Sequence, residues 1–96
     1  MRIAGAAVAV PAPFWLYDGV VTRQEVALIA QTRRELADGT ARVRRAATGI
    51  RLGEFARLLG VSTPAVSQWE RAVRVPGAKH ALSYGRELAA LERKAA

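Results

Sequence analysis

The chain has 96 residues, about half of them apolar, and a formal charge of +7. This length suffices for one domain with a modest core but not for a second, ligand-sensing domain. Residues 41–80 carry eight Arg or Lys against two acidic residues, whereas residues 1–40 balance four against four. Such a basic half fits a nucleic acid, an acidic membrane or a solvated surface, and charge alone leaves all three open.

Side chains for catalysis or metal binding are scarce. The chain lacks cysteine, which excludes a disulfide framework and a thiolate metal site and suits a reducing cytoplasm. His80 is the single histidine, and Asp18 and Asp38 lie in the other half of the chain. Because a metal centre or a catalytic triad needs several convergent groups, we expect no metal, no cofactor and no enzymatic activity. His80 is expected on a helix surface.

Residues 1–21 form an Ala-, Val- and Pro-rich segment ahead of a single helical domain expected over residues 22–96. Neither this segment nor the rest of the chain contains the roughly 20 consecutive apolar residues that span a bilayer, so we expect no membrane association. Phe14, Trp15 and Tyr17 are costly to leave in water. We expect them to pack on the domain; the alternative is that they bind a protein partner.

The first predicted helix covers about residues 23–37. Thr22 and Glu25 have the spacing of a capping box, in which each side chain accepts a hydrogen bond from a free backbone donor. Asp38 and Gly39 end the helix. Its expected inward face consists of Val26, Ile29, Ala30, Leu36 and Ala37.

A second helix is predicted over about residues 40–48, opened by the hydroxyl of Thr40 and closed by Gly49. It carries Arg42, Arg44 and Arg45.

Residues 51–71 have the pattern of two short helices joined by a tight turn. Phe55, Ala56 and Leu59 give the first helix an apolar stripe at helical period. Gly60 then tolerates the left-handed backbone that commonly ends a helix. Ser62 can accept a hydrogen bond from a free N–H of the next helix, and Pro64 suits that helix's first turn.

The second of these helices, expected over residues 62–71, has an inward stripe of Val66 and Trp69. Its outward side chains are small, amide-bearing or basic, and they are Thr63, Pro64, Ser67, Gln68 and Arg71. A short helix of this kind, with arginines around it, suits a DNA groove.

The last helix is predicted over residues 78–94, as one long helix or as two short ones broken near Gly85. Leu82 is expected to complete the core. Leu88 and Leu91 lie further along and would either cover the first helix or form a dimer seam.

Several short runs of residues in this region occur in the order and at the spacing of a pattern found in one protein family, G-L, L-A, L-G-V-S, I-S, W-E and P. They are Gly49-Ile50, Phe55-Ala56, Leu59-Gly60-Val61-Ser62, Val66-Ser67, Trp69-Glu70 and Pro76. From Ala41 to Leu88 the sequence therefore resembles the lambda-repressor-like DNA-binding domain of the Cro and XRE family. The resemblance implies an all-α fold of five to six helices, here with an extra N-terminal helix.

The resemblance also implies roles for individual residues. Thr63, Pro64, Ser67 and Gln68 would face the major groove. Arg45 would pair with Glu70 in a partly buried bridge, which is physically sensible because an unpaired carboxylate beside Trp69 would be expensive. Basic residues near the motif are expected to bind phosphates, and they are Arg42, Arg44, Arg51, Arg71, Arg74 and Lys79.

Four positions depart from the family's pattern. Leu52 stands where the family often has a phosphate-binding Gln, and Gly53 costs about 1 kcal/mol relative to Ala within a helix. Ala72 replaces the usual helix-ending Gly. Pro64 removes a polar side chain from a base-reading position, so direct readout would depend on Thr63, Ser67 and Gln68.

We therefore expect a sequence-specific regulator that binds double-stranded DNA, acting as a repressor-like homodimer on an inverted repeat in the cytoplasm, at the nucleoid. One alternative is an antitoxin or phage control protein that also binds a protein, through Phe14, Trp15 and Tyr17 or through Leu88 and Leu91. The other is a protein-interaction module whose helix-turn-helix no longer binds DNA.

Overall fold

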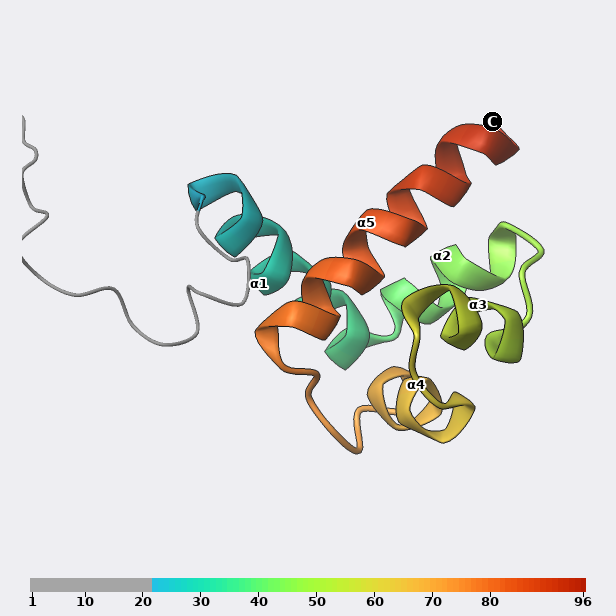
Figure 1. Cartoon of the computed structure of the whole chain (residues 1–96), viewed down its shortest axis with the longest axis horizontal. Helices are drawn as coiled ribbons and strands as arrows, with labels where there is room; N and C mark the ends of the chain where they lie inside the picture. The colour runs from blue at the N-terminus through green and yellow to red at the C-terminus, as the bar shows by residue number, and fades with distance from the viewer. Residues whose placement is uncertain (1–21) are drawn as a thin grey trace, which may run out of the picture.

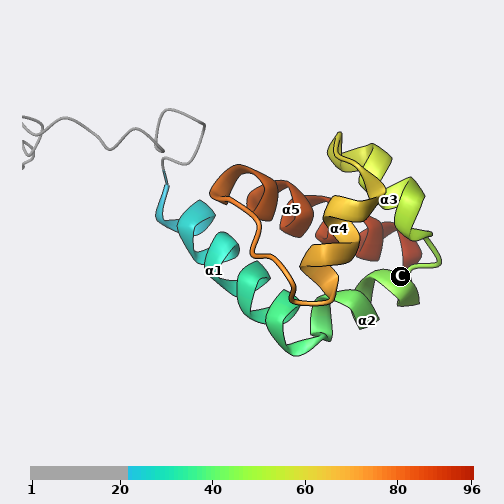
Figure 2. The ribbon, with the colours of Figure 1, turned by 90° about the horizontal axis from the view of Figure 1, so that it is seen from below.

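The computed structural model describes residues 22–96, which form a bundle of helices without strands in that range (Figures 1 and 2). The helices are α1 (Arg23–Asp38), α2 (Thr40–Ala47), α3 (Leu52–Leu59), α4 (Thr63–Glu70) and α5 (Ala78–Ala95). This confirms the predicted all-α fold. Phe14, Trp15 and Tyr17 lie outside the described residues, so their packing stays a prediction.

The capping box at the start of α1 is present. The Thr22 hydroxyl accepts from the Glu25 backbone N–H at 3.0 Å, and the Glu25 carboxylate accepts from the Thr22 N–H at 3.1 Å. At the other end Gly39 takes a left-handed conformation, with φ +88°. The helix therefore begins and ends where its local sequence predicts.

The buried face of α1 was predicted in part. Ile29 and Leu36 are buried as predicted, whereas Val26 is 44% exposed and Ala30 and Ala37 are exposed as well. Thr32, which was not predicted, is the third buried residue of the helix. It lies against Gly85 of α5, so contact with a helix far along the chain explains why this polar residue is buried.

The start of α2 also differs from the prediction. Thr40 lies inside the helix, and the Asp38 carboxylate accepts from its backbone N–H at 2.8 Å. Hydrogen bonding to the Thr40 side chain, and then to the Thr40 backbone N–H, lowers the pKa of Asp38. The helix ends at Ala47, one residue earlier than expected, and Gly49 follows with φ +86°.

The helix-turn-helix of α3 and α4 is formed as predicted. Phe55 and Ala56 are buried, Gly60 is left-handed with φ +71°, and the Ser62 hydroxyl accepts from the Ala65 N–H at 3.2 Å. Pro64 lies in the first turn of α4. Val66 and Trp69 are buried beneath that helix.

The core lies between the helix-turn-helix and α5. The rings of Phe55 and Tyr84 meet edge to face with centroids 4.9 Å apart, an arrangement that aromatic pairs prefer. Leu88 belongs to this core and is 2% exposed, while Leu91 packs on it partly buried. Leu88 is therefore not further out than the core: it lies in one cluster with Leu36 of α1, and of the two alternatives for this residue the dimer seam is wrong.

Helix α5 is continuous through Gly85 and runs across the domain with α1 beside its first half (Figure 1). Gly85 does not break the helix. Its missing side chain permits close contact with α1, since a Cβ there would lie 2.5 Å from the Thr32 hydroxyl oxygen. His80 is partly buried rather than on an open surface, because its ring packs 5.5 Å from that of Trp69.

Candidate nucleic-acid interface

The outward face of α4 lies at one edge of the domain, in the foreground of Figure 2. Thr63 and Pro64 are exposed, whereas Ser67 and Gln68 are half-buried. The opposite face of the helix holds Val66, Trp69 and Glu70 in the interior. The structure thus brings the four predicted groove-facing residues together on one side of a firmly anchored helix.

A small polar pocket of about 100 Å³ lies beside this face, between α2, α3 and α4. Arg42 and Arg71 line it and are exposed, and Arg71 Nε donates to the Ser67 hydroxyl at 3.1 Å. Leu52 lines it as well and packs against the core. Two cationic side chains therefore lie near Ser67, while the Leu52 side chain cannot donate a hydrogen bond to an anion.

Arg51, Arg74 and Lys79 are exposed, so their charges are open to solvent. Arg44 is different. Its guanidinium lies between the carboxylates of Glu35 and Glu92, with Nε donating to Glu92 at 2.8 Å. The hydrogen bonds that Arg44 donates to Glu92 raise the pKa of Arg44 and lower the pKa of Glu92. We therefore assign Arg44 to an ion-pair network that ties α2 to α1 and α5.

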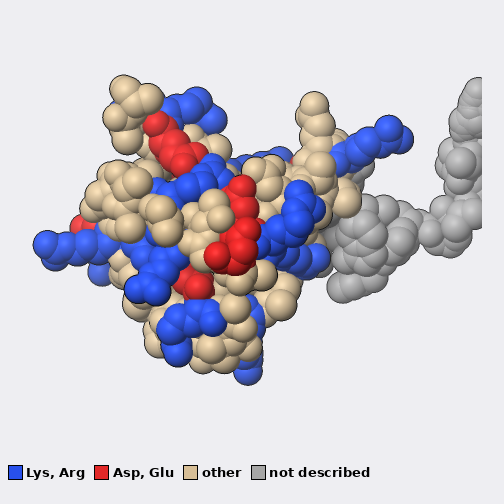
Figure 3. Space-filling view, turned by 180° about the vertical axis from the view of Figure 1, so that it is seen from behind, with Lys and Arg blue, Asp and Glu red and all other residues tan. Residues whose placement is uncertain are grey.

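Positive charge is interrupted on the face that Figure 3 shows, opposite to the view of Figure 1. Basic side chains spread across this face, and acidic side chains lie among them in its middle part. The exposed arginines near α4 are therefore a better indication of where an anionic partner would bind than the total charge of the chain is.

The bridge that the resemblance implies between Arg45 and Glu70 is present. Arg45 donates through Nε and Nη2 to the two Glu70 oxygens, at 2.5 and 2.9 Å, and the residues are 8% and 7% exposed. Arg45 Nη1 also donates to the Ile50 carbonyl oxygen at 3.1 Å. The hydrogen bonds with Glu70 raise the pKa of Arg45. The bridge fastens the end of α4 to α2.

Tyr84 is a third member of this bridge that the sequence did not reveal. Its hydroxyl donates to Glu70 Oε2 at 2.8 Å from α5. Burial, reinforced by the Glu70 charge, raises the pKa of the Tyr84 hydroxyl, so it stays a donor. The one available signal was a tyrosine within the apolar stripe of α5, since a buried tyrosine hydroxyl usually has a partner.

The backbone after α4 closes in a Schellman-type turn. The Val73 N–H donates to the Gln68 carbonyl oxygen at 2.8 Å. Ala72 adopts φ +59°, the one positive value among the described residues other than glycine. Ala72 therefore takes the left-handed conformation that glycine usually adopts after a helix, which places alanine in a strained conformation.

Ala72→Gly is expected to raise the free energy of unfolding by about 0.5–1 kcal/mol. Glycine relieves the left-handed strain of about 1–2 kcal/mol, and the greater freedom of its unfolded chain offsets part of that gain. Urea denaturation followed by circular dichroism measures the change. The matched control is Ala46→Gly on the exposed side of α2, which should lose about 1 kcal/mol; equal losses in both variants would contradict the left-handed turn.

Comparison with protein-family models matches residues 42–89, half of the chain, to a model described as helix-turn-helix, of the Cro/C1 type. The chain belongs to the helix-turn-helix family. No curated protein and no solved structure matches this helix-turn-helix chain. The matched segment contains α3 and α4 entire, together with most of α2 and the first part of α5, and α1 precedes it.

Family membership supports a DNA-binding regulator of the helix-turn-helix class. Between residues 22 and 96, no helix of this helix-turn-helix protein is both long and apolar enough to cross a membrane. Nor does that part of the chain gather three or more His, Cys, Asp or Glu side chains into a group that would hold a metal ion.

Proposed function

We propose that the protein binds double-stranded DNA sequence-specifically by placing α4 in the major groove. The observation that supports this most directly is the division of α4 into two faces. Val66, Trp69 and Glu70 fix its inner face. Its outer face carries the exposed Thr63 and Pro64 and the half-buried Ser67 and Gln68. Two exposed arginines, Arg42 and Arg71, lie beside it.

Gln68 carries most of the proposed base recognition. A glutamine amide can donate and accept at once, which matches the adenine edge in the major groove. Thr63 and Ser67 add hydroxyl groups, and the Thr63 methyl and Pro64 ring suit a thymine methyl group. Since Ser67 Oγ already accepts from Arg71, that hydroxyl keeps its own hydrogen to donate.

Phosphate contacts are proposed for the exposed basic residues around α4, namely Arg42, Arg51, Arg71, Arg74 and Lys79. Arg44 is left out because Glu35 and Glu92 already occupy its guanidinium. Such contacts position a protein on the duplex and release counterions. They would hold α4 in register without reading the sequence.

A homodimer on an inverted repeat follows from the size of α4. Its eight residues span about 12 Å at 1.5 Å per residue, which is enough for about four base pairs. So short a site recurs too often in a genome to direct regulation. Two copies on half-sites one helical turn apart would supply the missing specificity, and occupation of a promoter by such a dimer would repress it.

Gln68→Ala separates base reading from backbone binding. Against an operator selected from random DNA, the variant should bind about 5- to 150-fold more weakly, the equivalent of a base contact of about 1–3 kcal/mol. Binding to random DNA should change little. Fluorescence anisotropy over a salt series measures both, and wild-type log K should fall with log salt with a slope of about −4 to −5 per copy for five phosphate contacts.

Gln24→Ala is the matched control, because this glutamine is exposed at the start of α1. It should bind both DNAs as the wild type does. Equal weakening of Gln68→Ala on operator and random DNA would remove Gln68 from base reading. No binding of the wild type at low salt would favour a protein-interaction module instead.

A further inference from the structure

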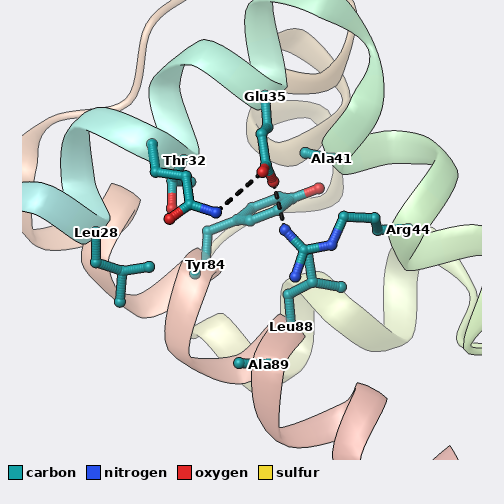
Figure 4. A pocket seen from close by; sticks show the side chains of 10 residues that line it. Leu28, Thr32, Glu35, Ala41, Arg44, Tyr84, Leu88 and Ala89 are labelled. Atoms are coloured by element: carbon teal, nitrogen blue, oxygen red, sulfur yellow. Dashed lines mark hydrogen bonds and ion pairs between the residues drawn. The ribbon is translucent and has the colours of Figure 1, made fainter.

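A cavity of about 220 Å³ lies between α1, α2 and α5, and its lining includes none of the proposed base-reading residues of α4 (Figure 4). Its apolar lining includes Leu28, Ala41, Leu88 and Ala89. An engineered apolar cavity of about 150 Å³ is large enough to bind benzene. The space is therefore sufficient for a small organic molecule.

Thr32 contributes a buried polar group to this cavity. The residue is 4% exposed, and its hydroxyl makes no hydrogen bond with any residue of the described part of the chain. It faces Gly85, because a Cβ at that glycine would lie 2.5 Å from Thr32 Oγ1. Buried hydroxyl groups nearly always have a partner, and leaving one without a partner is costly. The cavity thus offers a hydrogen bond to whatever enters it.

Charged side chains at the cavity restrict the charge of an occupant. Arg44 and Glu35 line the cavity and form an ion pair, and Gln31 Nε2 donates to Glu35 Oε2 at 3.1 Å (Figure 4). Glu92, outside the lining, also pairs with Arg44. Arg44, Glu35 and Glu92 together carry one negative charge, and the charge of Arg44 is already balanced by its two carboxylate partners. An anionic molecule would be repelled, and any ion would lose its hydration against the apolar lining.

We propose that this cavity binds a small neutral molecule with an apolar body and one hydroxyl group. The body would fill the space beside Leu28, Leu88 and Ala89, and the hydroxyl would pair with Thr32. The proposal concerns a site apart from α4 and stands whether or not the protein binds DNA.

Benzyl alcohol is the probe. Toluene, which lacks the hydroxyl group, and benzoate, which carries a negative charge, are compared with it. In ¹H–¹⁵N spectra of the full chain, benzyl alcohol should shift amides around the cavity saturably, with a Kd of about 1 mM, as expected for about eight non-hydrogen atoms at roughly 0.5 kcal/mol each. Toluene should bind about fivefold more weakly because it leaves the Thr32 hydroxyl unpaired. Benzoate should not bind at about 10 mM, a concentration well above that Kd.

Two variants test the assignment of the site. Ala89→Leu fills the cavity and should abolish the saturable shifts, whereas Ala90→Leu, one residue along α5 and outside the lining, should retain them. Thr32→Val keeps the shape without the hydroxyl and should remove the preference for benzyl alcohol over toluene. Its urea midpoint should equal or exceed that of the wild type.

Absence of saturable shifts with benzyl alcohol would overturn the proposal. So would shifts that persist in Ala89→Leu. A lowered urea midpoint for Thr32→Val would also overturn it, since that result would mean that a fixed water already satisfies the hydroxyl.

Discussion

Glu70→Ala is expected to lower the free energy of unfolding by about 3–5 kcal/mol, because removing one partner of a buried ion pair leaves the other charge uncompensated. Arg45 would be that charge, at 8% exposure. Its raised pKa in the native protein reflects Glu70 itself, and even without Glu70 a guanidinium does not lose its proton at accessible pH. The Tyr84 hydroxyl would lose its acceptor in the same substitution.

Urea denaturation followed at 222 nm measures this loss. Domains of this kind have about 5–15 kcal/mol of stability in total, so the variant should be marginally folded at best. The matched control is Glu54→Ala, which removes an exposed carboxylate that accepts from the Arg51 N–H at 2.9 Å. Loss of that capping contact should cost about 1 kcal/mol.

A triple variant keeps the prediction decisive if Glu70→Ala fails to fold. Arg45→Met, Glu70→Leu and Tyr84→Phe together replace the polar cluster by apolar groups of similar volume. Replacing a complete buried ion pair in this way is often neutral or stabilising, so the triple variant should be more stable than Glu70→Ala. Similar losses in Glu70→Ala and Glu54→Ala would contradict a buried bridge.

Gly85→Ala is expected to destabilise the protein by about 2 kcal/mol, against the roughly 1 kcal/mol that alanine gains over glycine from helix propensity. The new Cβ would lie 2.5 Å from Thr32 Oγ1 and 3.0 Å from Leu28 Cδ1. Real Cβ atoms do not lie 2.5 Å from another atom, so either the Thr32 and Leu28 side chains change rotamer or α1 and α5 move apart, and both rearrangements disturb the packing between these helices. Thermal and urea denaturation measure the loss.

Gly53→Ala provides the matched control, since that glycine also lies within a helix. A Cβ at Gly53 would meet Thr63 Oγ1 at 3.6 Å, an ordinary contact. This variant should gain up to about 1 kcal/mol from helix propensity. The two substitutions thus have opposite expected signs, and stabilisation by both would mean that α1 and α5 are not in close contact at Gly85.

The sequence by itself determined both ends of α1, the end of α3 and the start of α4. Gly39 and Gly60 take the left-handed backbone, and Thr22 and Ser62 cap the helices that follow them. Each of these features depends on groups within about four residues of one another. Local chemistry of that range is written directly in the sequence, and it also placed Val66 and Trp69 on the inner side of α4.

Only part of the candidate site could be predicted, because the sequence shows local chemistry directly but not contacts between distant residues. The outward position of Thr63 and Gln68 follows from the helical period once α4 is located. The pairing of Arg45 with Glu70 came from family resemblance and could not be read from spacing. Whether Arg42 or Arg44 is free to meet an anion depended on acidic residues far along the chain, and Glu92 lies 48 residues from Arg44.

Tertiary structure alone decided the remaining features. It buried Thr32 of α1 and left Val26 exposed, placed Leu88 in the core, and brought Gly85 into close contact with α1 without breaking α5. It also joined Tyr84 to Glu70 and left Thr32 beside a cavity. Each outcome depends on contact between helices separated by dozens of residues, where burial and available space override local preference. Hydrophobic periodicity cannot indicate which helix will pack against a given face.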